Sequence, residues 1–138
     1  MTHLIDTNVI SELRKGQRSD PNVRAWFSAL REEEIFLSVL TVGEIRKGIE
    51  SIRLRDRTAA RALDRWLRQI VSSYKERILP IDQKVAERWG EMNVPDPLPV
   101  LDGLIAATAL VHELTLATRN VKDVARTGVS FVNPFAPR

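Results

Sequence analysis

Five short apolar runs, separated by longer segments of helical pattern, constrain the fold of this chain more than any other feature of its sequence. Each run is continuous rather than alternating, which is typical of strands that are buried on both faces of a parallel sheet. Such runs in alternation with helices predict an α/β fold. The predicted strands are His3–Asp6, Ile35–Ser38, Ile78–Ile81, Leu114–Thr118 and Val129–Val132.

The segments between these runs predict six helices of ordinary length and one short helix. Gly16 is a helix stop signal, and Asp20 followed by Pro21 is a start signal. The loop Val94–Pro99 is too rich in proline for a helix or a central strand, and the tail after Val132, NPFAPR, is expected at the surface. The predicted helices are Asn8–Lys15, the segment opened by Asp20 and Pro21, Thr41–Arg53, Asp56–Tyr74, Asp82–Met92, Val100–Glu113 and a short helix near Asp123.

The length of 138 residues suits one ordinary domain, predicted to span residues 1–138, with a core that needs no disulfide or structural metal. The absence of cysteine excludes thiolate metal sites and cysteine nucleophiles, and two histidines are too few for a histidine-based metal site. No apolar run approaches the ~20 residues that a membrane-spanning helix needs, and the amino terminus lacks the pattern of a signal peptide. We therefore expect a cytoplasmic protein without a membrane segment.

The charge of the chain is mildly basic, with a formal net charge of +3 and a sequence pI of about 9.7. This excess alone is weak support for a nucleic-acid partner. Most of the basic residues are arginine, whose planar guanidinium pairs well with phosphate or carboxylate. Because the chain also places carboxylates in a candidate site, we expect a negative pocket bordered by a positive rim.

Four acidic residues stand where an apolar run or a strand gives way to a helix: Asp6, Glu44, Asp102 and Asp123. In an α/β protein such positions face the crevice at the carboxyl edge of the sheet. Carboxylates that meet there repel one another unless a cation joins them. Oxygen ligands suit a hard divalent ion such as Mg²⁺ or Mn²⁺. The pattern predicts a metal-dependent site, with phosphate chemistry as the leading candidate.

Each of these acidic residues also has a purely structural explanation. Asp and Glu are favoured in the first turn of a helix, and Thr41-Val-Gly-Glu44 has the form of a capping box. Asp102 resists this explanation best, because it lies in the apolar stretch VLDGLIAATAL with no Lys or Arg within ten residues on either side. Burying an unpaired carboxylate is costly, and a metal ion is a natural partner.

The segments LIDTNVIS, TVGEIRKGI, LDGLIAATAL and LTLATRNVKDV together resemble the PIN-domain ribonucleases, in particular the VapC and FitB toxins of bacterial type II toxin–antitoxin pairs. The resemblance covers essentially the whole chain and implies a three-layer α/β/α fold with a central parallel five-stranded sheet. Asp6, Glu44 and Asp102 match the three core acidic positions of the family. The fourth position falls on Asn120 or Asp123, and the sequence leaves that choice open.

The resemblance implies an endoribonuclease that depends on Mg²⁺ or Mn²⁺. Asp6, Asp102 and Glu44 are then the expected metal ligands, and Asp123 is a fourth catalytic residue that acts through a water or a second metal. The expected substrate-binding or orienting residues are Asn8, Thr118, Arg119 and Asn120.

The expected partners are an RNA substrate, a cognate antitoxin and a second copy of the chain. The helices with Trp26, Phe27, Trp66 and Leu67 are expected to offer apolar stripes to the antitoxin. Two alternatives stay open at this point: a catalytically silent binding module with the PIN fold, and a DNA-directed nuclease. A receiver-like signalling domain is disfavoured, because the adjacent acidic pair and the lysine typical of that class are missing.

Overall fold

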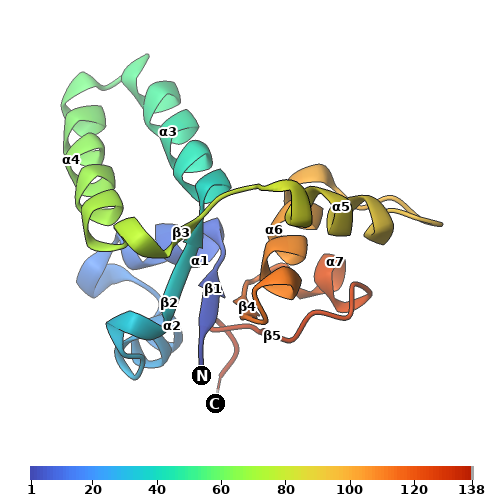
Figure 1. Ribbon diagram of the computed structural model, residues 1–138. Coiled ribbons are helices and arrows are strands. Elements are labelled where there is room, and N and C mark those ends of the chain that lie inside the picture. The colour runs from blue at the N-terminus through green and yellow to red at the C-terminus, as the bar shows by residue number, and fades with distance from the viewer. Residues whose placement is uncertain (138) are drawn as a thin grey trace.

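A computed structural model of the chain, which describes residues 1–137, has one five-stranded sheet at its centre (Figure 1). All strands are parallel, and their order across the sheet is β3-β2-β1-β4-β5. The first strand is therefore central, and the chain winds away from it in both directions. The strands are β1 (His3–Ile5), β2 (Ile35–Ser38), β3 (Ile78–Leu79), β4 (Thr115–Ala117) and β5 (Phe131–Val132).

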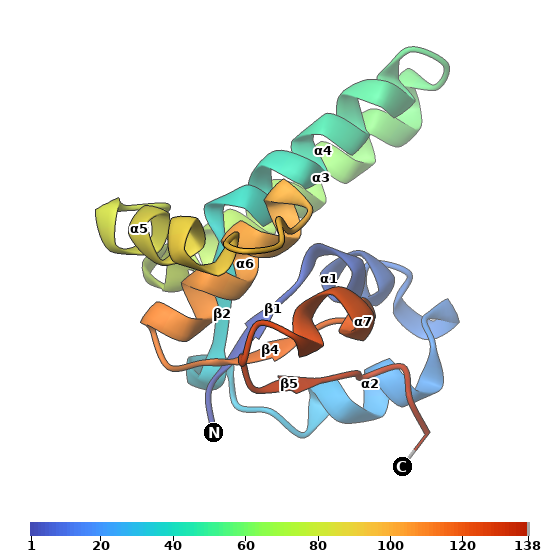
Figure 2. The same ribbon diagram turned by 90° about the vertical axis from the view of Figure 1, so that its right-hand side faces the viewer.

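Helices cover both faces of the sheet, which gives the three-layer architecture (Figures 1 and 2). Side chains alternate across β1, so Ile5 packs into a core shared with α1 to α4, whereas Leu4 packs into a second core with α6 and α7. The helices are α1 (Thr7–Leu13), α2 (Pro21–Ser28), α3 (Val39–Arg53), α4 (Arg57–Ser73), α5 (Gln83–Met92), α6 (Val100–Val111) and α7 (Val121–Ala125). Within residues 1–137, no helix is long and apolar enough to cross a membrane.

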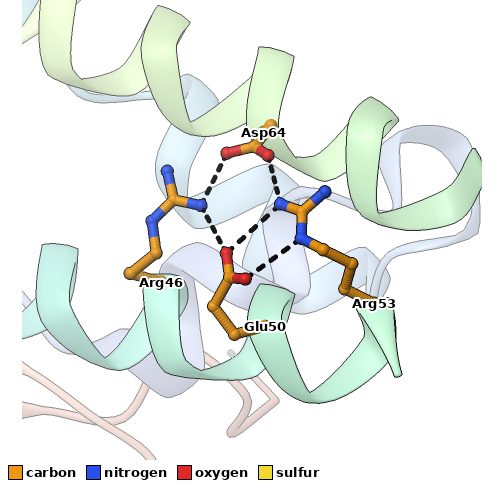
Figure 3. A network of polar contacts seen from close by, with 4 residues as sticks. All are labelled: Arg46, Glu50, Arg53 and Asp64. Atoms are coloured by element: carbon orange, nitrogen blue, oxygen red, sulfur yellow. Dashed lines mark hydrogen bonds and ion pairs between the residues drawn. The ribbon is translucent and has the colours of Figure 1, made fainter. Parts of the chain in front are cut away.

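The helices α3 and α4 form a hairpin that projects beyond the rest of the molecule (Figures 1 and 2). Asp56 caps the amino terminus of α4 by accepting a hydrogen bond from the Ala59 backbone N–H. Two arginines of α3 and one acidic residue from each helix form a closed network of ion pairs between them (Figure 3). Its members are Arg46, Glu50, Arg53 and Asp64.

The fold predicted from the sequence is confirmed, including the parallel five-stranded sheet and the place of every strand. The element ends differ by at most two residues, as frayed ends usually do. One difference is larger in consequence: α3 begins at Val39 rather than at Thr41, with Ser38 as its cap.

The expectation that the tail after Val132 lies on the surface is wrong for two of its residues. Pro134 is buried, and Phe135 packs against the core that α1 to α4 share. The tail is fixed by Asn22, whose side-chain amide donates a hydrogen bond of 3.1 Å to the Phe135 carbonyl.

Candidate active site

The candidate site lies where the carboxyl ends of three neighbouring strands meet. Asp6 directly follows β1, Ser38 ends β2, and Thr118 directly follows β4. Because β1 lies between β2 and β4 and all three run in the same direction, these ends share one edge of the sheet. This is the topological switch point at which open α/β sheets bind their ligands.

Asp6 is the most enclosed carboxylate of the site, with 7% of its surface exposed. Its Oδ1 accepts a hydrogen bond of 2.7 Å from the Thr7 backbone N–H, and its Oδ2 accepts one of 2.7 Å from the Thr118 hydroxyl. Burial raises the pKa of Asp6, and the charges of Glu44 and Asp102 raise it further, whereas the bonds from Thr118 and Thr7 lower it. Asp6 is therefore within electrostatic reach of two other carboxylates.

Glu44 joins the site from the second turn of α3. Its Oε1 accepts a hydrogen bond of 2.6 Å from the Thr7 hydroxyl, which lies 3.1 Å from the hydroxyl of Thr41. The capping-box explanation of Glu44 is wrong, because Ser38 caps α3 by accepting a bond of 3.0 Å from the Leu40 N–H. Glu44 thus points back to the strand ends and not to its own helix terminus.

Asp102 lies in the first turn of α6, beside both candidates for the fourth position. The Asn120 side-chain amide donates a hydrogen bond of 3.2 Å to Asp102 Oδ2. Burial raises the pKa of Asp102, and the next largest cause is the charge of Asp123, followed by the opposing bond from Asn120 and then the charge of Glu44. Asn120 and Asp123 therefore both lie next to Asp102, one as a donor and the other as a second carboxylate.

Thr118 connects the two halves of the site. Its side chain is fully buried, and its oxygen accepts a hydrogen bond of 3.0 Å from the Asn120 backbone N–H while its hydroxyl donates to Asp6. Asn8 completes the network, since its side-chain nitrogen lies 3.4 Å from both Asp6 Oδ2 and Thr118 Oγ1. The structure brings together three of the four residues predicted to bind or orient the substrate, Asn8, Thr118 and Asn120.

Two residues of this network were missed from the sequence. No role was predicted for Thr7, and Thr41 was interpreted as part of a capping box. The sequence signal that points to Thr41 is the presence of two hydroxyl residues, Ser38 and Thr41, either of which can cap α3. If Ser38 is chosen, Thr41 falls on the buried face of the first turn, toward Thr7.

The side chains of the site match the ligand preferences of a divalent cation in part. The four carboxylates provide only oxygen ligands, which suits a hard ion such as Mg²⁺ or Mn²⁺. Within residues 1–137, however, no three acidic or histidine side chains are already gathered closely enough to form a ready-made metal cluster. Hydroxyl and amide donors bind oxygens of Asp6, Glu44 and Asp102. The residues fit the ion in chemistry and charge, and side-chain rotation is needed for them to converge on it.

The basic residues near the site have different environments. Arg119 follows Thr118 and is exposed, and its backbone N–H donates a hydrogen bond of 3.1 Å to Asn8 Oδ1. Arg46, two residues after Glu44, is engaged with Glu50 and Asp64 in the network of Figure 3 and is not directed to the site. The arginines of the outer face of α4 are exposed, as expected for a solvated surface: Arg57, Arg61, Arg65 and Arg68.

Similar proteins have the same architecture over nearly the whole chain. A profile of the PIN domain matches residues 3–128. Toxin FitB of Neisseria gonorrhoeae is 34% identical over 137 residues, which cover 96% of this chain and 97% of FitB. VapC ribonuclease Y4jK of Sinorhizobium fredii is 31% identical, covering 97% of this chain and 98% of that protein. The crystal structure of FitAcB from Neisseria gonorrhoeae superposes with a TM-score of 0.88 at 34% identity, covering 97% of this chain and 99% of that one.

Proposed function

Since this chain belongs to the PIN-domain family, in the group that includes toxin FitB and VapC ribonuclease, we propose that it is a metal-dependent endoribonuclease and the toxin of a type II toxin–antitoxin pair. The observation that supports this most directly is that Thr7 bonds two of the carboxylates at once, Asp6 through its backbone N–H at 2.7 Å and Glu44 through its hydroxyl at 2.6 Å. Both Asp6 and Asp102 have raised pKa values, with burial as the largest cause, and both are influenced by the charge of Glu44. Carboxylates within electrostatic reach of one another at a sheet edge are suited to a divalent cation.

We assign Asp6, Asp102 and Glu44 as ligands of Mg²⁺ or Mn²⁺, and Asp123 as a fourth carboxylate that acts beside Asp102. When bound, such an ion supplies an activated water and neutralises charge on the phosphoryl oxygens of the RNA. Thr7 orients Glu44, and Thr118 orients Asp6, each through one short hydrogen bond. The Asn8 side-chain amide donates to Asp6, and that of Asn120 donates to Asp102, as residues around metal ligands commonly do.

The nuclease assignment is tested by cleavage of RNA with Mg²⁺ or Mn²⁺ and by its loss in excess chelator. Asp6→Asn and Asp102→Asn are expected to abolish cleavage while the protein stays folded. Asp96→Asn is the matched control, because Asp96 is an exposed carboxylate in the loop before α6. Undiminished cleavage in chelator, or by Asp102→Asn, would exclude the assignment.

The same assay separates the alternatives. A DNA oligonucleotide of the same sequence as the RNA distinguishes a DNA-directed nuclease, because only that enzyme would prefer the DNA. A catalytically silent binding module would bind RNA and cleave neither the RNA nor the DNA oligonucleotide, whichever metal ion is added.

The antitoxin is proposed to occupy a groove that begins at the carboxylate site. This groove, with a volume of about 170 Å³, is lined by residues of α1, α3 and α4 that include Thr7, Glu44, Ile49, Leu63 and Trp66. Because Glu44 lies at its edge, a segment bound there can place a Lys or Arg among the carboxylates. Of the residues expected to offer apolar stripes, Trp26 and Leu67 are buried in the chain's own core, whereas Trp66 lines this groove.

We expect the toxin to act in the cytoplasm, where its proposed RNA substrate is found, and to form a homodimer, which sedimentation at micromolar concentration tests. Expression of the toxin alone should arrest growth, and co-expression of the neighbouring small gene product should restore it. The Asp6→Asn variant should be harmless yet still bind that product. Benign expression of the wild type in a host without the neighbouring gene would exclude the toxin role even if ribonuclease activity is found.

A further inference from the structure

The tail after β5 provides an aromatic platform at the rim of the carboxylate site. The guanidinium carbon of Arg119 lies 4.2 Å from the centroid of the Phe135 ring, within the range of a cation–π contact. Phe135 is itself fixed, because its backbone N–H bonds Asn133 Oδ1 at 3.0 Å and its carbonyl accepts from Asn22 at 3.1 Å. The ring also packs against the core of α1 to α4, so the platform does not move freely.

Arg119 is linked to the site through its neighbours on both sides. Thr118 donates to Asp6, Asn120 donates to Asp102, and the Arg119 backbone N–H bonds Asn8. The Arg119 side chain leaves the site on the side of α1, where its charge is one of the smaller causes that lower the pKa of Glu12, after the hydrogen bonds from Lys15 and Asp20. Among residues 1–137, no acceptor forms a hydrogen bond or ion pair with its guanidinium.

A guanidinium whose central carbon lies over an aromatic ring keeps N–H donors that can bind another group. This arrangement holds the planar fork in one orientation, and the fork matches the two free oxygens of a phosphate. We propose that Phe135 is a positioning residue that holds Arg119 in place to bind a backbone phosphate of the RNA beside the one that is cleaved. The inference rests on the proposed ribonuclease function, and Phe135 lies outside residues 3–128, which match the PIN-domain profile.

The proposal is tested by measuring RNA binding in the absence of cleavage. All variants carry Asp6→Asn, and the ligand is a fluorescent single-stranded RNA. Arg119→Ala should weaken binding about tenfold and reduce the slope of log affinity against log salt by about 0.7, the value for one phosphate on a single strand. Phe135→Leu, which keeps apolar volume but removes the ring, should weaken binding about two- to fivefold. Phe135→Tyr and Phe135→Trp should restore wild-type binding.

A double-mutant cycle separates positioning from a general structural role. If Phe135 acts through Arg119, Phe135→Leu has no further effect on RNA affinity in the Arg119→Ala background. Phe131→Leu is the matched control, since Phe131 is an exposed phenylalanine on β5 and should leave binding unchanged. Arg119→Lys keeps the positive charge but not the planar guanidinium. It should therefore retain the salt slope and still lose RNA affinity, and it leaves the packing of the core unchanged.

The inference is overturned if Phe135→Leu costs the same affinity with and without Arg119, or if Arg119→Ala leaves the salt slope unchanged. It is also overturned if Arg119→Ala weakens only the antitoxin complex, because the guanidinium would then serve a carboxylate of the protein partner. These outcomes are distinct from failure of the proposed function, in which the parent protein itself neither binds nor cleaves RNA.

Discussion

Replacing Thr118 with valine removes one hydroxyl from the centre of the carboxylate site while it keeps the size and β-branching of the side chain. Thr118 is 0% exposed, so water cannot replace the lost group. The hydroxyl donates a hydrogen bond of 2.7 Å to Asp6 Oδ2, and its oxygen accepts a hydrogen bond of 3.0 Å from the Asn120 backbone N–H. The acceptor Asp6 is a buried carboxylate that loses a donor, whereas the Asn120 backbone N–H is a neutral group of a residue at the surface. The cost of the substitution therefore falls mainly on Asp6.

The expected destabilisation follows from the charge of the acceptor. A hydrogen bond to a charged group contributes about 1.5–3 kcal/mol, and the loss of one partner leaves the other group buried without compensation. We therefore expect Thr118→Val to lower the free energy of unfolding by about 2 kcal/mol at neutral pH. For a chain of this size, that corresponds to a fall of roughly 6–10 °C in the thermal midpoint.

The penalty should depend on pH in a defined direction. The Thr118 bond lowers the pKa of Asp6, against the larger effect of burial, so its removal raises that pKa. A protonated Asp6 no longer needs a donor to its charge. The difference in stability between wild type and Thr118→Val should therefore be full above the pKa that Asp6 has in the variant, and it should shrink as the pH falls through that value.

The measurement is urea unfolding in chelator-containing buffer at neutral and mildly acidic pH. Thr108→Val is the matched control, because Thr108 is also 0% exposed but its hydroxyl donates to the Leu104 carbonyl, a neutral acceptor. That control should cost about 0.5–1 kcal/mol and show no dependence on pH. Equal costs for the two valine variants, or a Thr118→Val cost that persists in the Asp6→Asn background, would refute the reasoning.

Three further outcomes are expected. Asp123→Asn should reduce RNA cleavage more than Asn120→Ala, because only the carboxylate brings charge to a metal; the reverse order in side-by-side rates would move the fourth position to Asn120. Burial lowers the pKa of His3, so below about pH 6.5 the unfolded chain binds more protons than the folded chain. The free energy of unfolding should therefore fall with falling pH, by at most ~1.4 kcal/mol per pH unit. This slope should disappear in His3→Phe, and an unchanged slope in that variant would contradict the prediction. Asp64→Asn should lower the thermal midpoint more than Glu50→Gln. Asp64 of α4 forms ion pairs with both arginines of α3, whereas Glu50 pairs with them within its own helix. Equal effects would argue against the network as a link between the helices.

The sheet was predictable because its strands are buried on both faces, so each appears as a continuous apolar run. The place of Asp6 at the carboxyl edge of the sheet followed from the same reasoning, since residues just after parallel strands share one edge. Glu44 and Asp102 lie within helices, so their positions beside this edge depend on how α3 and α6 pack. The sequence did not decide between Ser38 and Thr41 as the cap of α3, because both side chains can accept a bond from a helix N–H. The choice depends on where β2 stops, which is set by its pairing with β1 and β3.

The burial of the tail was less accessible to sequence reasoning. A phenylalanine between prolines and alanine in NPFAPR has no periodicity that assigns it to a core. Its position depends on Asn22, which is far away in the chain and bonds the Phe135 carbonyl, and on the pairing of β5 with β4. Contacts of this kind between a helix and a distant tail are fixed only when the whole sheet is assembled.

The position of Glu44 depends on the projecting hairpin as a whole. Glu44 reaches Thr7 from α3, and α3 is supported along its length mainly by α4. Near the sheet that support is apolar, with Ile45 and Leu67 in the core, whereas the turn beyond Arg53 exposes Leu54. The ion pairs with Asp64 lie between these regions, and surface ion pairs are weakened by salt. High salt should therefore loosen the outer half of the hairpin before it affects Glu44, because the inner half is held by hydrophobic burial, which salt does not screen.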